Sequence, residues 1–414
     1  MTRTDSTGGV GVASNACGPG VVSTNVEIDN IMGSNAIYAV YAAYPNDVRI
    51  SSLAVAGDDV QVGFGPLLAG VDYALLYRAS VTNGSWSEVA TMVGAGEAIA
   101  ALAHAGGAGA YGYYRIESPN GPTNRIWGYA RVAKPGNGKL NVVGIPFRTT
   151  NQTLNSLMDP LQFSGHYLSP GSADQIMIWD AGTQGYLNLA LYDARSFGEQ
   201  YAYLTGWKAY TNFTGATYLN PVLPPGSAVW LKGSTADDRQ ATVAGEVMMD
   251  AAATNAIKKG LQLVANPFSE TIGLSNLHIQ AHATGHYLSP GSADQIMVWD
   301  AGTQGYLNLA LYDVAAYYGP QYAYLTGWRA YTNFAGGPYV NPVFEPGKGF
   351  WYRAVSNDFE WVETNPYLDG LGGGTKAVPK TVAAGATAPA NRMRKDVPKP
   401  APVRAIRNRL RTPP

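Results

Sequence analysis

The sequence predicts an all-β protein built from several domains in tandem: an N-terminal sandwich, two similar antiparallel β sandwich or barrel domains, and a disordered basic tail. Two observations carry this prediction. Short apolar runs of strand length alternate with turn residues along the chain, and the composition includes 49 Gly, 26 Pro and 27 Tyr but only 14% charged residues. Such a composition favours short strands joined by tight turns. A chain of 414 residues is long enough for two to four domains.

The first segment, residues 1–25, is rich in Gly, Ser and Thr and shows no periodicity, so it is predicted to be disordered. It contains Cys17, the single cysteine of the chain, which excludes an intrachain disulfide. This thiol either pairs between chains, carries a modification, or is incidental. The segment also lacks the apolar core of a signal peptide.

Residues 26–120 contain strand-length runs separated by turn signals, including an Asn-Gly pair at 83–84. The predicted strands are Val48–Val55, Asp59–Phe64, Val71–Arg78, Glu88–Val93 and Tyr111–Glu117. Tyr73, Tyr77 and Arg78 lie in one of these strands, Trp86 lies in the turn that follows it, and residues 113–115 lie in the last strand. Together these positions resemble the C-terminal half of bacterial fibronectin type III-like domains. The resemblance implies a β-sandwich that acts as a spacer or adhesion module.

A duplication follows, and it dominates the sequence. The 29-residue stretch Gly165–Asp193 returns as Gly285–Asp313 with one change, Ile178 to Val298. Weaker matches on both sides extend the duplication to a first unit at 126–240 and a second at 241–364. A period of about 120 residues indicates duplicated domains, because solenoids and propellers repeat every 20–50 residues.

Within each unit the pattern is β. In the first unit, a strand at 175–179, a turn at 180–185 and a strand at 186–192 predict a hairpin with Trp179 and Tyr186 as a cross-strand pair. Val243–Met249 is predicted to open the second unit. Two explanations of the high identity stay open: the hairpins and the aromatic stretches after them present one surface twice, or gene conversion has kept them alike.

The order of motifs in these units resembles an uncharacterised repeat domain of large secreted and surface proteins of bacteria. The carrying motifs are Ala-Asp-Gln-Ile-x-x-Trp-Asp at 173–180 and 293–300, and Pro-Gly-x-x-Phe-Trp at 346–351. The first unit departs from the second motif at Val229, where the second unit has Phe350. The resemblance implies a secreted or surface location and no known chemistry.

The last segment, residues 365–414, is rich in Pro, Ala and Gly and is predicted to be a disordered tail. From Leu371 onward it holds ten Lys and Arg and one acid, so its net charge is +9, while the rest of the chain carries −10. We expect this tail to contact acidic polymers or the acidic part of a neighbouring copy. Nucleic acid is a less favoured partner, because no aromatic residues are interleaved with the basic ones.

Ten residues are candidates for a binding surface, because exposed aromatic rings beside carboxylates can hold sugars or anchor interfaces. They are Tyr201, Tyr203, Trp207, Tyr322, Tyr324, Trp328, Asp174, Asp180, Asp294 and Asp300. The aspartates have alternative interpretations as turn caps, which is the favoured one, as Ca²⁺ ligands or as a catalytic pair. His278, His282 and His286 have the i, i+4, i+8 spacing of a helical metal face, but the first unit repeats only the last of them.

Functionally, the sequence predicts a non-enzymatic structural or adhesive protein of the extracellular space or cell surface, in which the duplicated domains could self-assemble. No nucleophile elbow, phosphate loop or zinc-protease motif is present. The expected partners are the protein itself or other surface proteins, and no cofactor is expected. The alternative is a bivalent carbohydrate-binding protein. No apolar run reaches the length of a membrane span.

Overall fold

The computed structural model describes residues 48–119, 121–123 and 125–368, and the backbone of three strands before them. These strands, β1 (Val12–Ala16), β2 (Val22–Ile28) and β3 (Ile37–Ala42), form an antiparallel sheet in that order. β1 and the start of β2 fall inside the segment predicted to be disordered, where β-branched Val and Thr residues favour strands. Cys17 and the basic tail from residue 369 lie outside the described residues.

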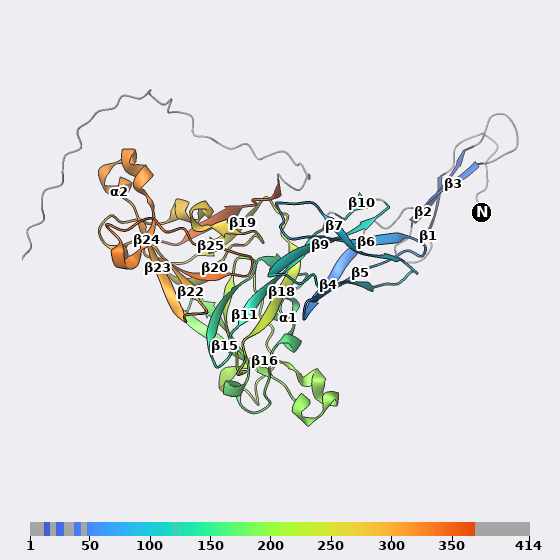
Figure 1. The fold of residues 1–414 in the computed structure, drawn as a ribbon, viewed down its shortest axis with the longest axis horizontal. Helices are drawn as coiled ribbons and strands as arrows, with labels where there is room; N and C mark the ends of the chain where they lie inside the picture. The colour runs from blue at the N-terminus through green and yellow to red at the C-terminus, as the bar shows by residue number, and fades with distance from the viewer. Residues whose placement is uncertain are drawn as a thin grey trace, which may run out of the picture. The chain divides into compact units, whose positions relative to one another are not determined.

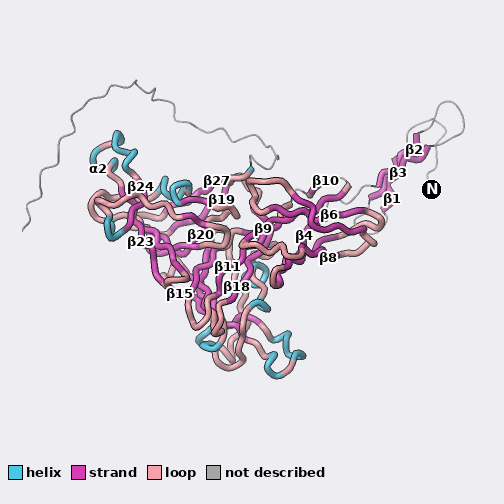
Figure 2. The backbone as a smooth tube through the Cα atoms, viewed as in Figure 1, coloured by secondary structure: helices cyan, strands magenta, loops and turns pink. Residues whose placement is uncertain are grey.

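The predicted all-β class is confirmed, since strands are the main regular structure of the described residues, their helical segments are all short, and every strand pair is antiparallel (Figures 1 and 2). No described helix is longer than six residues. The helical segments are α1 (Leu154–Leu157), α2 (Ala315–Tyr318) and the 3₁₀ segments η1 (Pro160–Gln162), η2 (Pro170–Ser172), η3 (Arg195–Phe197), η4 (Glu199–Leu204), η5 (Tyr210–Asn212), η6 (Leu274–Asn276), η7 (His278–His282), η8 (Pro290–Ser292), η9 (Pro320–Leu325) and η10 (Tyr331–Asn333).

The N-terminal part is a two-layer sandwich. One sheet has the order β4-β5-β8 and faces β7-β6-β9 of a second sheet, and their shared core includes Val62, Phe64, Leu75 and Tyr114. The five strands predicted here are all confirmed. The sequence pattern missed β8, which lies in a Gly- and Ala-rich stretch. The strands are β4 (Arg49–Ala56), β5 (Asp59–Gly65), β6 (Asp72–Arg78), β7 (Ser87–Val93), β8 (Ala100–His104) and β9 (Tyr111–Ser118), with β10 (Gly121–Pro122) beside β9.

The second sheet of this sandwich continues without a break into the first repeat. Strand β11 (Trp127–Lys134) pairs with β9 on one side and with β18 (Arg239–Val247) on the other, and β13 (Phe147–Arg148) completes the edge. Val243–Met249, predicted to open the second repeat, therefore lies largely in the closing strand of the first. The second repeat opens instead with β19 (Ala252–Ile257), which pairs with β27 (Phe359–Thr364).

Each repeat packs such a two-stranded ribbon against a five-stranded sheet. The sheet of the first repeat has the order β12-β17-β14-β15-β16, and that of the second has the equivalent order β20-β26-β22-β23-β24. The strands are β12 (Leu140–Gly144), β14 (Gln175–Asp180), β15 (Gly185–Tyr192), β16 (Gly206–Ala209), β17 (Ala228–Lys232), β20 (Gly260–Ala265), β22 (Gln295–Asp300), β23 (Gly305–Tyr312), β24 (Gly327–Ala330) and β26 (Gly349–Ala354), with a small pair β21 (Ile272–Gly273) and β25 (Val343–Phe344). The first repeat thus spans 127–247 and the second 252–364.

The fold also includes the first residues of the segment predicted as tail. Tyr367 is fully buried, its hydroxyl donates to the carbonyl of Met248 (2.6 Å), and its ring meets Phe268 edge to face. The side-chain amide of Asn365 donates to the same carbonyl (3.1 Å). Residues 365–368 therefore follow the second repeat in the sequence but return to the first, where Tyr367 joins its hydrophobic core.

The shared sheet leads to a prediction about Gly128. A Cβ at this position would lie 2.7 Å from the ring of Phe147 and 2.8 Å from that of Tyr113, both of which are buried. We expect Gly128→Ala to lower the free energy of unfolding by about 1–3 kcal/mol through overpacking, as measured by urea denaturation. The control is Gly109→Ala, where the nearest atom to a Cβ is 3.5 Å away; equal effects of the two changes would contradict the prediction.

Candidate binding surface

The two duplicated hairpins end against each other's repeat. The indole N–H of Trp179 donates to the carbonyl of Leu261 (2.7 Å), and that of Trp299 donates to the carbonyl of Leu140 (2.8 Å). The side-chain amide of Gln184 donates to the carbonyl of Leu261 and accepts from its N–H, and Gln304 makes the same two hydrogen bonds with Leu140. Each of these hairpin contacts is made in both directions, so the two hairpins are related by a local two-fold arrangement.

Aromatic rings fill the space between these hydrogen bonds. The ring centroids of Trp179 and Trp351 lie 5.1 Å apart, and those of Trp230 and Trp299 also lie 5.1 Å apart, both edge to face. Burial raises the pKa of Tyr186 and of its counterpart Tyr306, which complete the cluster. The predicted cross-strand pair of Trp179 and Tyr186 is confirmed. These rings form the center of a packed interface.

The backbones approach closely at the same interface. The N–H of Gly144 donates to the carbonyl of Gly347 (2.9 Å), and the N–H of Ala265 donates to the carbonyl of Gly226 (2.8 Å). A Cβ on Gly144 would lie 2.6 Å from the Cβ of Ala265. The glycine is needed because the two edge strands touch there. The two-fold interface is the name used below for these contacts, which are made by Trp179, Gln184, Trp230, Gly144 and Gly226 and by their counterparts Trp299, Gln304, Trp351, Ala265 and Gly347.

Four of the ten candidate residues are buried, and two of these four are tryptophans. Trp207 is fully buried and Trp328 is 2% exposed. Each occupies the edge strand of its sheet with its side chain turned toward the ribbon that covers the sheet, where Trp207 meets Phe163 at 5.2 Å. Neither can stack on an external ligand.

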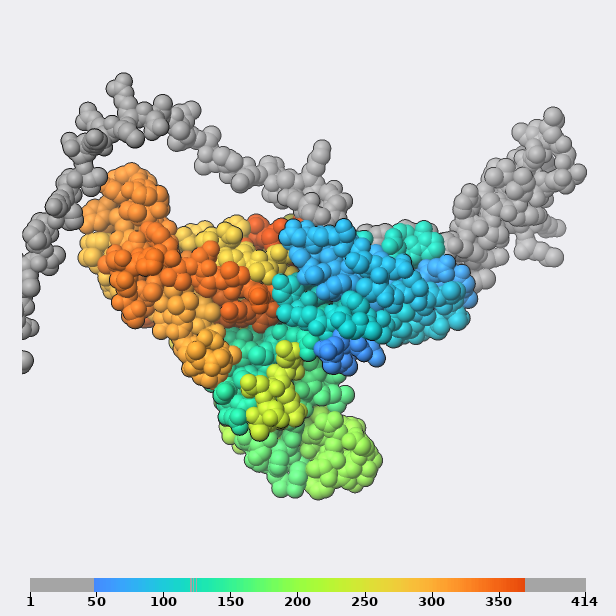
Figure 3. All heavy atoms as spheres, in the orientation of Figure 1, coloured from blue at the N-terminus to red at the C-terminus, as the bar shows by residue number. Residues whose placement is uncertain are grey.

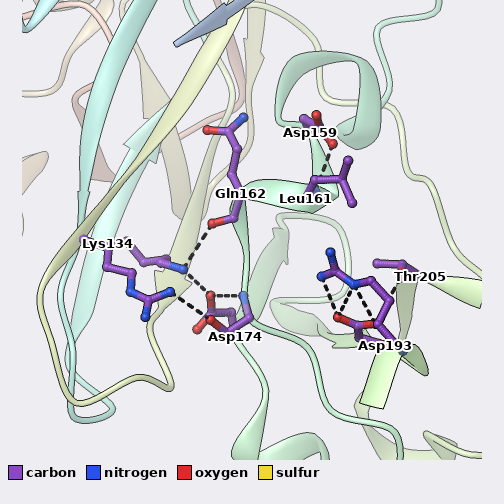
Figure 4. A network of polar contacts seen from close by, with 10 residues as sticks. Lys134, Asp159, Leu161, Gln162, Asp174, Asp193 and Thr205 are labelled. Atoms are coloured by element: carbon purple, nitrogen blue, oxygen red, sulfur yellow. Dashed lines mark hydrogen bonds and ion pairs between the residues drawn. The ribbon is translucent and has the colours of Figure 1, made fainter. Parts of the chain in front are cut away.

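Asp174 and Asp294 are also buried, and each joins separate segments of its repeat. In Figure 4, Asp174 accepts a hydrogen bond from Lys134 (2.5 Å), which also donates to the carbonyl of Gln162. Further donors to Asp174 are the backbone N–H groups of Ser164 and Ser234, both at 2.7 Å. This carboxylate has enough partners to remain buried as a charge.

In the second repeat, the equivalent carboxylate is bound by a different side chain. Asp294 accepts from the hydroxyl of Tyr352 (2.7 Å) and from the N–H groups of Thr284 and Val355. Burial raises the pKa of Tyr352, and the charge of Asp294 raises it further, so the hydroxyl keeps its proton and donates. A neutral donor in the second repeat thus takes the place of the ammonium group in the first.

Asp180 and Asp300 are exposed in the hairpin turns and act as caps. Hydrogen bonds from the backbone, first from Gly182 (2.7 Å), lower the pKa of Asp180, and Gly302 (2.9 Å) lowers that of Asp300. This matches the favoured interpretation of these residues as turn caps.

The three histidines of the second repeat point to different partners. His278 contacts Glu363 (2.7 Å), His282 stacks on Phe359, and His286 stacks on Tyr287. His278 and His282 lie in the 3₁₀ turn η7 and His286 lies beyond its end, so the α-helical spacing on which a common metal face would depend is not formed. Within the described ranges, no group of three or more His, Cys, Asp or Glu residues could hold a metal ion.

The remaining four candidates are exposed, and equally so in the two repeats. Tyr201 and Tyr322 are each 38% exposed, while Tyr203 and Tyr324 are 76% and 74% exposed. They lie on the turns η4 and η9, at the end of β15 or β23 away from the hairpin turn. The two turns belong to protruding green and orange lobes in Figure 3.

Each lobe contains a line of touching rings that the sequence analysis missed, here called the aromatic row. In the first repeat, Tyr167 meets Phe197 at 4.5 Å and Phe197 meets Tyr201 at 6.5 Å. His166 stacks on Tyr167 at 5.2 Å. The row of the second repeat consists of His286, Tyr287, Tyr317, Tyr318 and Tyr322. The signal was present in the sequence as an aromatic residue kept inside the dissimilar stretch that interrupts the otherwise similar span 165–213, namely 194–199 against 314–320.

Comparisons of the sequence and fold with known proteins add little information about this surface. No family model matches the chain, and no curated protein matches its sequence. A solved structure described as "tetra-tandem repeat in extending region of large adhesion protein" aligns with 81% of this chain and 82% of its own, at 9% identity and a TM-score of 0.17. A TM-score this low does not indicate a shared fold. The resemblances to fibronectin type III-like and surface repeat domains stay predictions.

The two-fold interface predicts matched effects of Trp179→Ala and Trp299→Ala. Each should lower the free energy of unfolding by about 2–4 kcal/mol, somewhat below the cost for a fully buried tryptophan. The double variant should lose less than the sum, because both rings belong to one packed cluster. Chemical denaturation measures all three, with the exposed Tyr203→Ala as control. Clearly unequal single variants, or strict additivity, would contradict the symmetry.

The two aspartate sites predict unequal effects of removing their partners. Lys134→Ala leaves a buried carboxylate without its cation and should cost about 3–5 kcal/mol. Tyr352→Phe removes one hydrogen bond to a carboxylate that keeps two others, and should cost about 1.5–3 kcal/mol. Arg148→Ala, in an exposed ion pair with Asp250, is the control and should change little. If Tyr352→Phe proved as costly as Lys134→Ala, the assigned roles would be wrong.

Proposed function

We propose that the protein is a non-enzymatic structural or adhesive protein of the extracellular space or cell surface, which presents two copies of one surface. The observation that carries the proposal is that the two-fold interface holds together two repeats whose lobes expose equivalent aromatic side chains to the same extent. Packing explains why the hairpins are alike, but it does not explain why rings such as Tyr203 and Tyr324 are 76% and 74% exposed. Exposed aromatic side chains of this kind are typical of interaction surfaces.

The arrangement supports adhesion because it is bivalent. Two weak sites held by one framework act together on a partner that offers several equivalent sites, and their combined affinity exceeds that of either. The hydrogen bonds of the two-fold interface hold the two repeats together without relying on a flexible linker. Self-assembly, where it occurs, would have to use another surface, because the hairpin ends already contact the opposite repeat.

A second candidate, bivalent carbohydrate binding, is favoured by the exposure of Tyr201 and Tyr203 and of their counterparts. The proposed location rests on the low charge content and the Gly- and Tyr-rich composition. Among the helices of the described residues, none has both the length and the apolar character needed to span a bilayer.

The proposed location is tested with antibodies raised against residues 48–368. Intact cells that produce the natural protein should be labelled, and brief protease treatment of intact cells should remove the signal. A periplasmic or cytosolic protein released only by lysis serves as the control. Labelling that appears only after permeabilisation would overturn the proposed location.

A further inference from the structure

The aromatic row survives where the sequences of the two repeats differ. Phe197 and Tyr317 occupy equivalent positions in the dissimilar stretch, and they contact Tyr167 and Tyr287 at 4.5 and 4.4 Å. Both rings are exposed, by 59% and 51%. The second repeat has one extra residue here, and it is again aromatic: Tyr318, 56% exposed, contacts Tyr287 and Tyr322. Core packing does not require these rings, so the row itself is what the two repeats have in common.

The base of each row is held in a fixed orientation. His166 Nδ1 accepts hydrogen bonds from the N–H groups of Leu168 (3.0 Å) and Ser169 (2.9 Å), and its ring lies parallel to Tyr167, with 6° between the planes. His286 makes the same two bonds and lies at 7° to Tyr287. Rings fixed before binding lose little conformational entropy when a ligand arrives.

Exposed charge is not shared by the two lobes. Arg195 and Glu199 of the first lobe correspond to Ala315 and Pro320 of the second. The shared carboxylate, Asp193 or Asp313, accepts hydrogen bonds within its own repeat, from the N–H of Arg195 (2.9 Å) or Ala315 (2.8 Å).

The shared cationic position is buried, whereas the shared carboxylate is partly exposed. Lys208 and its counterpart Arg329 lie over the rings of Tyr192 and Tyr312, at 3.8 and 3.6 Å. A ligand recognised by both lobes in the same way therefore meets rings, hydroxyls and the amides of Gln200 and Gln321, and no common charge that is fully exposed.

We propose that each aromatic row binds an uncharged polysaccharide. The C–H faces of successive sugar rings would stack on the row, and sugar hydroxyls would bond to the tyrosine hydroxyls and the glutamine amide. A polymer of identical units offers equivalent sites to two equivalent rows, which a single protein partner does not. The inference deepens the adhesive function proposed above and rests on it.

The test uses the full chain and insoluble cellulose, chitin, mannan and xylan as probes, with alginate as a charged comparison. Retention of the protein on at least one neutral polymer is expected, and it should not fall between 50 mM and 500 mM NaCl, since no ion pairs are involved. Phe197→Ala should weaken retention at least tenfold through the loss of bivalency. Adding Tyr317→Ala and Tyr318→Ala should abolish it.

The matched control is Ile99→Ala, which removes an apolar side chain of similar exposure (64%) from the N-terminal sandwich and should leave binding unchanged. All variants concern exposed side chains, so their thermal unfolding should match that of the parent protein. Failure to bind any neutral polymer, binding that disappears with salt, or binding unaffected by the triple variant would overturn the inference.

Sedimentation of the protein alone separates this inference from the function on which it rests. If the triple variant abolishes concentration-dependent self-association and no polymer is bound, the row contacts a second copy and the polysaccharide inference is wrong. Surface labelling would then still support an adhesive or structural role. If antibodies do not label the natural protein on intact cells, the proposed function is contradicted, whether or not the protein binds a polymer.

Discussion

The two-fold interface is the constraint on which the rest of the structure depends. Each hairpin turn must fit the edge strand of the other repeat, so Trp179 and Trp299 face equivalent backbone carbonyls, at Leu261 and Leu140. Close backbone contact at Gly144 fixes how near the sheets lie. Because the hairpin turns are committed to this contact, the opposite ends of strands β15 and β23 carry the lobes that remain available to other molecules.

Differences between the repeats are concentrated where their surroundings differ. The ribbon of the first repeat is part of a sheet that continues into the N-terminal sandwich, whereas that of the second consists of β19 and β27 alone. The buried carboxylates illustrate the same point at the level of single residues. Asp174 has an ammonium partner from β11, and Asp294 has a phenol from β26, so one position is served by two chemistries.

Much of the fold could be predicted from the sequence, because turn residues mark the strands and the duplication marks the repeats. The ends of the repeats could not be predicted well, since β18 and β19 follow each other closely in the sequence and only their pairing partners decide to which repeat each belongs. The exposure of the candidate residues could be predicted only in part. Tyr203 and Trp207 lie in the same motif, yet one is exposed and the other is buried. A four-residue strand is too short for its alternation to show which face is covered.

The returned contacts of the hairpins have a consequence for how this gene can change. A segment that makes the same bonds to the same kind of edge strand in both halves can be copied from one half into the other without disturbing either. Exchange of DNA between the halves over 165–193 would therefore leave the fold unchanged. Replacing β19 with a copy of β11 would not, because β11 is adapted to a continuous sheet and β19 belongs to an isolated pair of strands. The fold therefore determines where such an exchange would be harmless.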